Sequence, residues 1–148
     1  MRLGWVLASV VLLSLLVALI FLATGDLPDG FSVVNESDPA EWHNKCNALV
    51  NLGKYDEALV CYKKAIELEP NLAYIWSGKG WALSNLGKYD EALVCYEKAI
   101  ELDPNLAYVW SGKGWALSNL GKYDEALVCY KKAIELDPNL TYVWSGKG

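Results

Sequence analysis

Histidine and arginine are almost absent from this sequence, with one residue of each among 148. Because His43 stands alone, the sequence supports neither a histidine-paired nucleophile nor a metal site with several histidine ligands. Apart from Arg2, every charged residue lies after Gly25, where 12 lysines stand against 18 aspartates and glutamates. Nucleic acids and anionic lipid surfaces are bound through basic patches, so this balance argues against both. We therefore predict no enzymatic activity, no cofactor, no metal and no nucleic-acid partner.

Charge is also missing from residues 3–23, a run of 21 residues without a single lysine, arginine, aspartate or glutamate. In a helix such a run reaches roughly the 30 Å of a hydrocarbon core, whereas cleaved signal peptides carry shorter apolar regions of about 7–15 residues. We expect residues 1–25 to form a retained transmembrane or signal-anchor helix in the cell membrane. Cleavage near Gly25, followed by secretion, is the alternative.

The flanking charges predict the orientation of this helix. Arg2 precedes it, whereas acidic residues follow it and the first lysine is Lys45. Because positive flanks stay in the cytoplasm, the rest of the chain should lie outside it, where the partner would be another envelope protein. Residues 26–38 show no helical period and contain Pro28 and Gly30, so we expect a flexible linker there.

The remaining sequence is repetitive. Residues 73–106 recur at residues 107–140 with two changes in 34, Ile75 to Val109 and Glu97 to Lys131. Residues 39–72 are a more diverged copy, and residues 141–148 begin a fourth. A fixed period of this length predicts a solenoid of stacked helical units.

One repeat predicts two helices. Trp76, Gly80 and Leu83 form one helical stripe, and Gly87 interrupts the pattern. A second stripe with its own helical spacing follows, formed by Ala92, Tyr96 and Ala99. Pro104 then ends the second helix. We predict an all-α fold of tandem antiparallel helix pairs.

These positions resemble the tetratricopeptide repeat. Its signature places are occupied by Trp76, Gly80, Leu83, Tyr89, Ala92, Tyr96, Ala99 and Pro104. The repeat sequence looks most like those of archaea and cyanobacteria, which often carry a lysine directly before this glycine, as Lys79 stands before Gly80. The resemblance covers residues 39–148 and implies a right-handed superhelix whose first helices line a concave, peptide-binding groove. The first copy departs from the pattern, with Cys46 in the place of Gly80.

The first helices carry a second stripe that is not needed for the core of each pair. We predict that this stripe binds the partner, through Tyr74, Ser77, Trp81, Asn85, Tyr108, Ser111, Trp115 and Asn119. Aromatic residues of this kind often supply most of the binding energy at interfaces. Packing of Trp81 and Trp115 against the adjacent repeat is the alternative. The stripe also lacks the lysine and arginine set with which other members of the family clamp a peptide carboxylate, so capture of a free C-terminus is not expected.

Three of the four cysteines, Cys61, Cys95 and Cys129, occupy the same place in successive repeats. Stacked units are too far apart for such residues to pair, since disulfides need Cα atoms within about 7 Å. We expect the cysteines to pack as small apolar residues. A disulfide between Cys46 and Cys61 across the first helix pair is the alternative.

The predicted function is a membrane-anchored scaffold that presents a peptide-binding groove outside the cytoplasm. The alternative is a structural subunit that polymerises head to tail, because Tyr142 and Trp144 lie in an unfinished repeat at the chain's end. A longer array of repeats is a competing explanation of that unfinished repeat. Asn35 and Asn139 lie in glycosylation sequons, which fits an external location.

Overall fold

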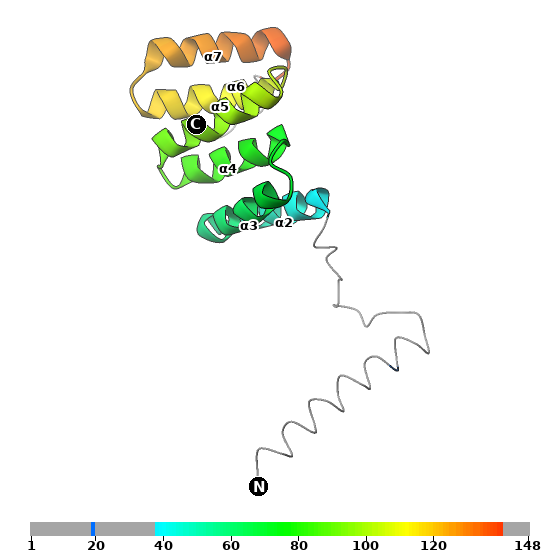
Figure 1. The fold of residues 1–148 in the computed structure, drawn as a ribbon. Helices are drawn as coiled ribbons and strands as arrows, with labels where there is room; N and C mark the ends of the chain where they lie inside the picture. The colour runs from blue at the N-terminus through cyan, green and yellow to red at the C-terminus, as the bar shows by residue number, and fades with distance from the viewer. Residues whose placement is uncertain (1–18, 20–37, 141–148) are drawn as a thin grey trace. The chain divides into compact units, whose positions relative to one another are not determined.

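The computed structural model describes Leu19 and residues 38–140. The chain divides into two units, residues 1–34 and 35–148, and the helices below belong to the second. Six helices follow one another in consecutive pairs, with no strand in the described part of the chain (Figure 1). They are α2 (Pro39–Asn51), α3 (Tyr55–Leu68), α4 (Ala73–Asn85), α5 (Tyr89–Leu102), α6 (Ala107–Asn119) and α7 (Tyr123–Leu136). The predicted all-α architecture of tandem helix pairs is confirmed.

A glycine turn joins the two helices of each pair. At Gly87 the backbone has a φ of 74°, a left-handed conformation that favours glycine. The N–H of Gly87 donates to the carbonyl of Ser84, and the N–H of Lys88 donates to that of Leu83 at 3.0 Å. These two bonds cap the end of α4 in a Schellman motif. Gly53 and Gly121 repeat the same conformation in the other pairs.

The connection between pairs is also fixed by the sequence. Pro104 follows the end of α5, and its carbonyl accepts a hydrogen bond of 2.8 Å from the indole N–H of Trp110. Trp76 makes the same bond to the carbonyl of Pro70 one repeat earlier. Helices α4 and α6 are therefore each tied back to the turn that precedes them.

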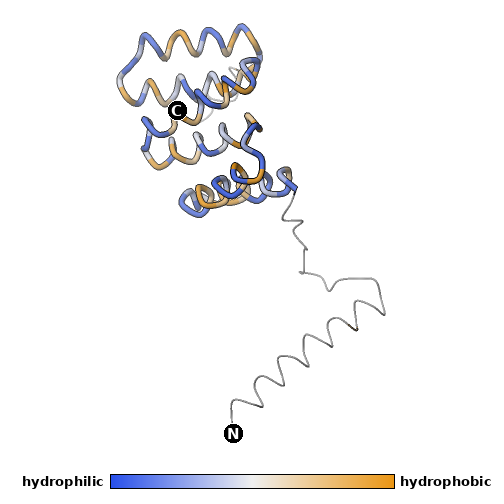
Figure 2. The backbone as a smooth tube through the Cα atoms, in the orientation of Figure 1, coloured by the Kyte–Doolittle hydropathy of each residue, from blue (hydrophilic) through white to orange (hydrophobic). Residues whose placement is uncertain are grey.

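The core lies between the helices and extends through the whole array. Ala92 and Ala99 are fully buried and Tyr96 nearly so, which confirms the predicted stripe of α5. The first helices α4 and α6 are buried on two sides: Ile75 of α4 packs with α3, while Leu83 packs with α5. Apolar and polar stretches alternate along the helices in Figure 2, as expected where each helix has a buried and an exposed side.

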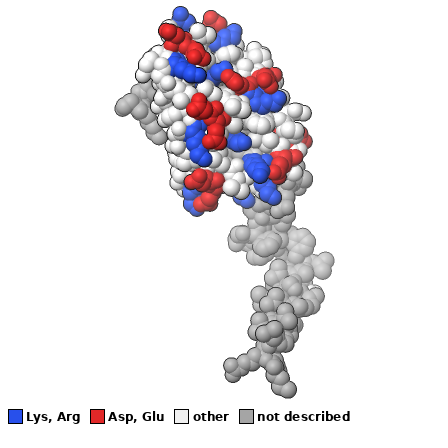
Figure 3. All heavy atoms as spheres, turned by 60° about the vertical axis from the view of Figure 1, so that its left-hand side comes forward, with Lys and Arg blue, Asp and Glu red and all other residues white. Residues whose placement is uncertain are grey.

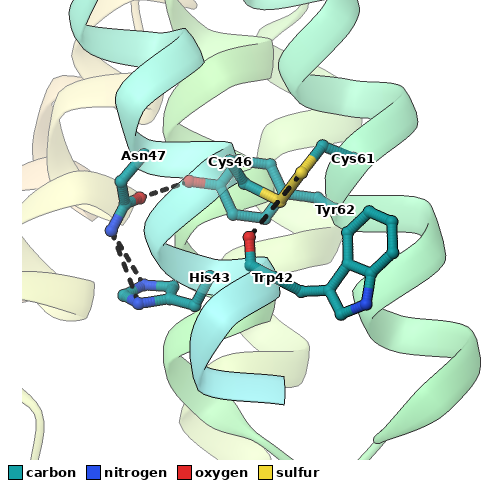
Figure 4. Close-up of a disulfide and its surroundings, with 6 residues drawn as sticks. All are labelled: Trp42, His43, Cys46, Asn47, Cys61 and Tyr62. Carbon is teal, nitrogen blue, oxygen red and sulfur yellow. Dashed lines mark hydrogen bonds between the residues drawn. A yellow bond between two sulfur atoms is a disulfide. The ribbon is translucent and has the colours of Figure 1, made fainter. Parts of the chain in front are cut away.

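The first helix pair corrects one expectation from the sequence. Cys46 of α2 and Cys61 of α3 form a disulfide, with their Cα atoms 5.4 Å apart (Figure 4). The expectation that all cysteines pack as small apolar residues is wrong for these two, and it holds for Cys95 and Cys129, which are free and buried. The reason is the crossing of the helices: at Gly80, the place of Cys46 in the next repeat, an added Cβ would lie 3.0 Å from the facing helix's tyrosine ring. A cysteine at that place reaches the partner helix.

No helix within residues 38–140 has the length and apolarity needed to cross a membrane. The predicted anchor, residues 1–25, lies outside the described residues except for Leu19. The predicted linker, residues 26–38, lies outside them except for Asp38, and the partial repeat, residues 141–148, lies outside them entirely.

Candidate functional site

A pocket of about 340 Å³ opens between the first helices of the three pairs. Helices α2, α4 and α6 supply its walls, and one side chain of α5 reaches it from below. The lining residues are His43, Asn47, Tyr74, Ser77, Gly78, Trp81, Tyr96, Tyr108 and Gly112. None of them is an acid, a lysine or an arginine. Burial lowers the pKa of His43 from its ordinary 6.5, so its ring is neutral at pH 7 as well.

A chain of hydrogen bonds closes the pocket at α2. The hydroxyl of Tyr62 donates to the side-chain oxygen of Asn47, and Nδ2 of Asn47 lies 3.1 Å from Nε2 of His43 (Figure 4). The ring of Tyr74 meets His43 edge-on, with ring centroids 4.6 Å apart. Burial raises the pKa of Tyr62 to about 12, so this end of the pocket is uncharged.

Two glycines allow tyrosine rings to lie directly beneath the pocket. A Cβ at Gly112 would lie 2.8 Å from the ring of Tyr96, and one at Gly78 would lie 2.6 Å from the ring of Tyr62. Real Cβ atoms do not approach so closely, so any larger residue would force the helices apart. Because glycine has no side chain beyond a hydrogen atom, Tyr96 can form part of the lining.

The hydroxyl of Tyr96 has no hydrogen-bond partner among the described residues, although it is buried. The neighbouring Ser84 hydroxyl is equally unpartnered. Burial is the main influence on Tyr96 and raises its pKa, while the Ser84 side chain lowers that pKa as a nearby hydrogen-bonding group. The two hydroxyls are therefore close, but their geometry falls outside that of a hydrogen bond. Two buried polar atoms are thus left unsatisfied at the base of the site.

A pair of indoles in contact connects the second helix pair to the third. Trp81 and Trp115 lie with ring centroids 5.4 Å apart and a 41° tilt. Tyr89 of α5 meets Trp115 edge-on at 5.9 Å. Trp81 therefore lines the pocket and packs against the adjacent repeat at the same time.

The predicted groove residues fall into two groups. Tyr74, Ser77, Trp81 and Tyr108 come together in the pocket. The other four do not line it. Ser111 is buried in α6, and Trp115 contacts the ring of Trp81. The amides of Asn85 and Asn119 donate to the carbonyls of Trp81 and Trp115 within their own helices.

The remaining predicted residues are not part of this site. Asn139 lies exposed in the turn after α7, where its backbone N–H donates to the side chain of Asp137 at 3.0 Å. Asn35, Tyr142 and Trp144 lie outside the described residues.

Five lining residues were not predicted from the sequence: His43, Asn47, Gly78, Tyr96 and Gly112. The repeat period does point to the first two, because His43 and Asn47 stand 34 residues before Ser77 and Trp81, which were predicted as groove residues. The diverged first copy hides this correspondence. Tyr96 was assigned to the core, and its access to the pocket depends on glycines that contribute no side chain.

Charged side chains lie mainly on the second helix of each pair. Helices α3, α5 and α7 carry five charged residues each, whereas α4 and α6 carry one each. Figure 3 shows acidic and basic side chains intermingled on one face of the molecule. Lys113 of α6 pairs with Glu97 of α5 at 3.0 Å, and Lys79 of α4 lies over the ring of Trp76. Residues 38–140 contain no cluster of His, Cys, Asp and Glu that could hold a metal ion.

A family model for the tetratricopeptide repeat matches residues 39–72, 73–106 and 107–140. The chain belongs to the tetratricopeptide repeat family. A TPR repeat-containing protein of Methanocaldococcus jannaschii, MJ0941, is 42% identical over 58 residues. That match covers 35% of this chain and 17% of the relative, so the chain spans only a small part of the relative's length.

Solved tetratricopeptide domains have the same fold. The first TPR of Spaghetti (RPAP3), bound to the HSP90 peptide SRMEEVD, is 29% identical with a TM-score of 0.67, covering 72% of this chain and 84% of that one. The second TPR of the same protein, with the same peptide, is 26% identical with a TM-score of 0.66, covering 70% and 95%. MamA from Desulfovibrio magneticus RS-1 is 28% identical with a TM-score of 0.63, covering 69% and 58%.

Proposed function

We propose that this chain is a scaffold that binds an extended peptide segment of another protein along the surface formed by its first helices. The observation that carries the proposal is the pocket, whose walls come from α2, α4 and α6 of three successive repeats. A ligand in it would contact all three repeats at once. The two Spaghetti domains bound to a peptide of HSP90 support this use of the fold.

The chemistry of the pocket distinguishes it from a site for acidic chain ends. The peptide in those structures, SRMEEVD, carries several carboxylates. Here no lysine or arginine lines the pocket, and a carboxylate buried without a cation is strongly disfavoured. Recognition of an internal, uncharged segment follows from this lining.

We also propose that residues 3–23 anchor the chain in the cell membrane with the repeats outside the cytoplasm. The uncharged run and the position of Arg2 support this placement. The disulfide between Cys46 and Cys61 supports it independently, because disulfides persist in oxidising compartments and are rare in the cytosol. The partner would then be another protein of the cell envelope.

Photo-crosslinking in cells that express the full chain tests the binding surface. A benzophenone amino acid replaces Tyr108, which is 40% exposed at the pocket, or Val94, which is 64% exposed and does not line it. Binding in the groove predicts a discrete adduct from position 108 and none from position 94. Adducts from position 94 alone, or from neither position, contradict the proposal.

The alternative, a filament built head to tail, has one observation in its favour. Helix α7 exposes an apolar face with Tyr123 at 71%, Leu127 at 52% and Ile134 at 45%, whereas the matching residues of α5 are half-buried under α6. A second copy could cover that face.

The first helix of a second copy fits this face poorly. Asn44 of α2 stands where Gly78 and Gly112 accommodate a tyrosine ring, and Glu41 stands where Ile75 and Val109 are fully buried. Continuing the solenoid across copies would therefore bury a carboxylate and crowd a ring. Long fibres of the full chain in sedimentation and electron microscopy, lost on replacing Tyr142 and Trp144 by serine, would favour the filament instead.

A further inference from the structure

Two tyrosines in the same repeat position differ in one respect. Tyr62 and Tyr96 are both buried beneath a glycine of the following first helix. The hydroxyl of Tyr62 is satisfied by the side-chain amide of Asn47. At the next repeat the place of Asn47 is taken by Trp81, and the hydroxyl of Tyr96 is left without a partner.

An unsatisfied buried hydroxyl is unusual in a folded protein and needs an explanation, of which a bound partner is one. A partner that enters the pocket meets the ring of Tyr96, since Tyr96 lines the pocket while Tyr62 does not. The hydroxyl oxygen is itself covered, so contact with it requires a small shift of the ring. The pocket volume, about 340 Å³, is at the small end of the roughly 300–1,000 Å³ typical of ligand sites. It has room for one or two side chains of an extended segment.

The lining selects the chemistry of that side chain. The walls are aromatic rings and small residues, and none of the lining groups is charged at pH 7. A carboxylate or an ammonium group would lose its hydration without gaining an opposite charge. A neutral group that can accept from the Tyr96 hydroxyl avoids this loss, and the first repeat already uses such a group, the amide of Asn47.

On the basis of the proposed function, we propose that the pocket takes the carboxamide of an asparagine or glutamine in an uncharged stretch of the partner. Its carbonyl oxygen accepts a hydrogen bond from the Tyr96 hydroxyl, as that of Asn47 does from Tyr62. The walls formed by Trp81, Tyr74 and Tyr108 cover the apolar part of the same side chain. The site therefore distinguishes an amide from the carboxylate of the same shape.

The test is a selection of random linear peptides displayed on phage against the full chain in detergent micelles. Expected winners are uncharged peptides with an asparagine or glutamine between apolar residues. One winner is then synthesised with that residue, with the isosteric aspartate or glutamate, and with lysine. Binding of each is measured by fluorescence anisotropy, and both charged versions should lose at least about tenfold in affinity.

Variants of the protein locate the contact. Tyr96→Phe should weaken the amide peptide about five- to tenfold, the loss expected for one hydrogen bond in a buried site. Tyr130→Phe is the matched control, because Tyr130 holds the same repeat position and packs against Gly114 as Tyr96 packs against Gly80, but it does not line the pocket. It should change affinity by less than about twofold. Ser84→Ala should also leave affinity within about twofold, which shows that the ligand and not Ser84 is the partner of Tyr96.

The outcomes separate the inference from the proposed function. Winners that are acidic, or cationic and held over the aromatic rings, overturn the carboxamide assignment while the groove remains a peptide site. Binding that is equal for wild type and Tyr96→Phe overturns it too. If no peptide is enriched, or if none reduces crosslinking from position 108, the proposed function fails together with it.

Discussion

Removal of the disulfide between Cys46 and Cys61 should destabilise the first helix pair by an amount that can be worked out from its position in the chain. The two residues are separated by 15 positions, and closing a loop of that length lowers the entropy of the unfolded chain by about 3 kcal/mol at 25 °C. Both side chains are buried at the crossing of α2 and α3. The double replacement Cys46→Ala, Cys61→Ala should therefore lower the free energy of unfolding by about 3 kcal/mol.

Urea denaturation followed by circular dichroism measures this change, with and without a thiol reductant. Reductant should lower the unfolding midpoint of the wild type and leave that of the double variant unchanged. Cys95→Ala is the control: Cys95 has the same repeat position as Cys61, is free, and should remain sensitive to reductant. Because repeats unfold in part independently, amide exchange should rise first in α2 and α3.

Two results would refute this reasoning. Alkylation of the unfolded, non-reduced chain should label two cysteines, Cys95 and Cys129. Labelling of all four in protein taken from its own compartment would mean that the first pair is not bridged there. A reductant effect of the same size in the double variant would mean that the destabilisation arises elsewhere.

Four further substitutions test the packing around the pocket. Tyr62→Phe should lower the free energy of unfolding by about 1 kcal/mol, because it removes the hydrogen bond to Asn47. Tyr96→Phe should be neutral or slightly stabilising, because the hydroxyl that it removes is unpaired. Equal losses of the two variants in urea denaturation would contradict this. Gly78→Ala should lower the free energy of unfolding by about 1–3 kcal/mol, because the new Cβ would lie 2.6 Å from the ring of Tyr62. This loss should outweigh the better helix propensity of alanine. A gain in melting temperature would count against that contact. Burial lowers the pKa of His43 in the folded chain below the ordinary value of 6.5. As the pH falls, the imidazole is therefore protonated in the unfolded chain before it is protonated in the folded chain. The free energy of unfolding should fall as the pH drops below 6.5 and level off below the folded-state pKa. His43→Gln should remove that part of the pH dependence in denaturation at pH 5 and pH 7.5, and an identical slope in wild type and variant would speak against it.

The sequence predicts the helix pairs well because the repeat period forces each residue type into one environment three times. Ala92, Tyr96 and Ala99 recur at a helical spacing, and their burial follows from that spacing alone. Four of the nine lining residues were predictable for the same reason, since Tyr74 and Trp81 have counterparts in the next copy.

The parts that escaped prediction depend on how the copies differ and on distances across helices. His43 and Asn47 belong to the diverged copy, where the stripe of Ser77 and Trp81 is no longer recognisable by residue type. Whether Cys46 reaches Cys61 depends on a Cα separation of 5.4 Å that no spacing in the chain encodes. The unpaired state of Tyr96 appears only when its ring is placed beneath Gly112.

The glycine and tyrosine contact between repeats makes the internal units interchangeable. Each offers a ring on one side and a glycine on the other, so a copy inserted after residue 72 or residue 106 would join both neighbours through a contact that already exists. Lengthening the array by duplication would extend the binding surface without requiring any new interface to evolve. The first unit, with Asn44 in the place of that glycine, could only begin such a series, which gives the array a direction of growth.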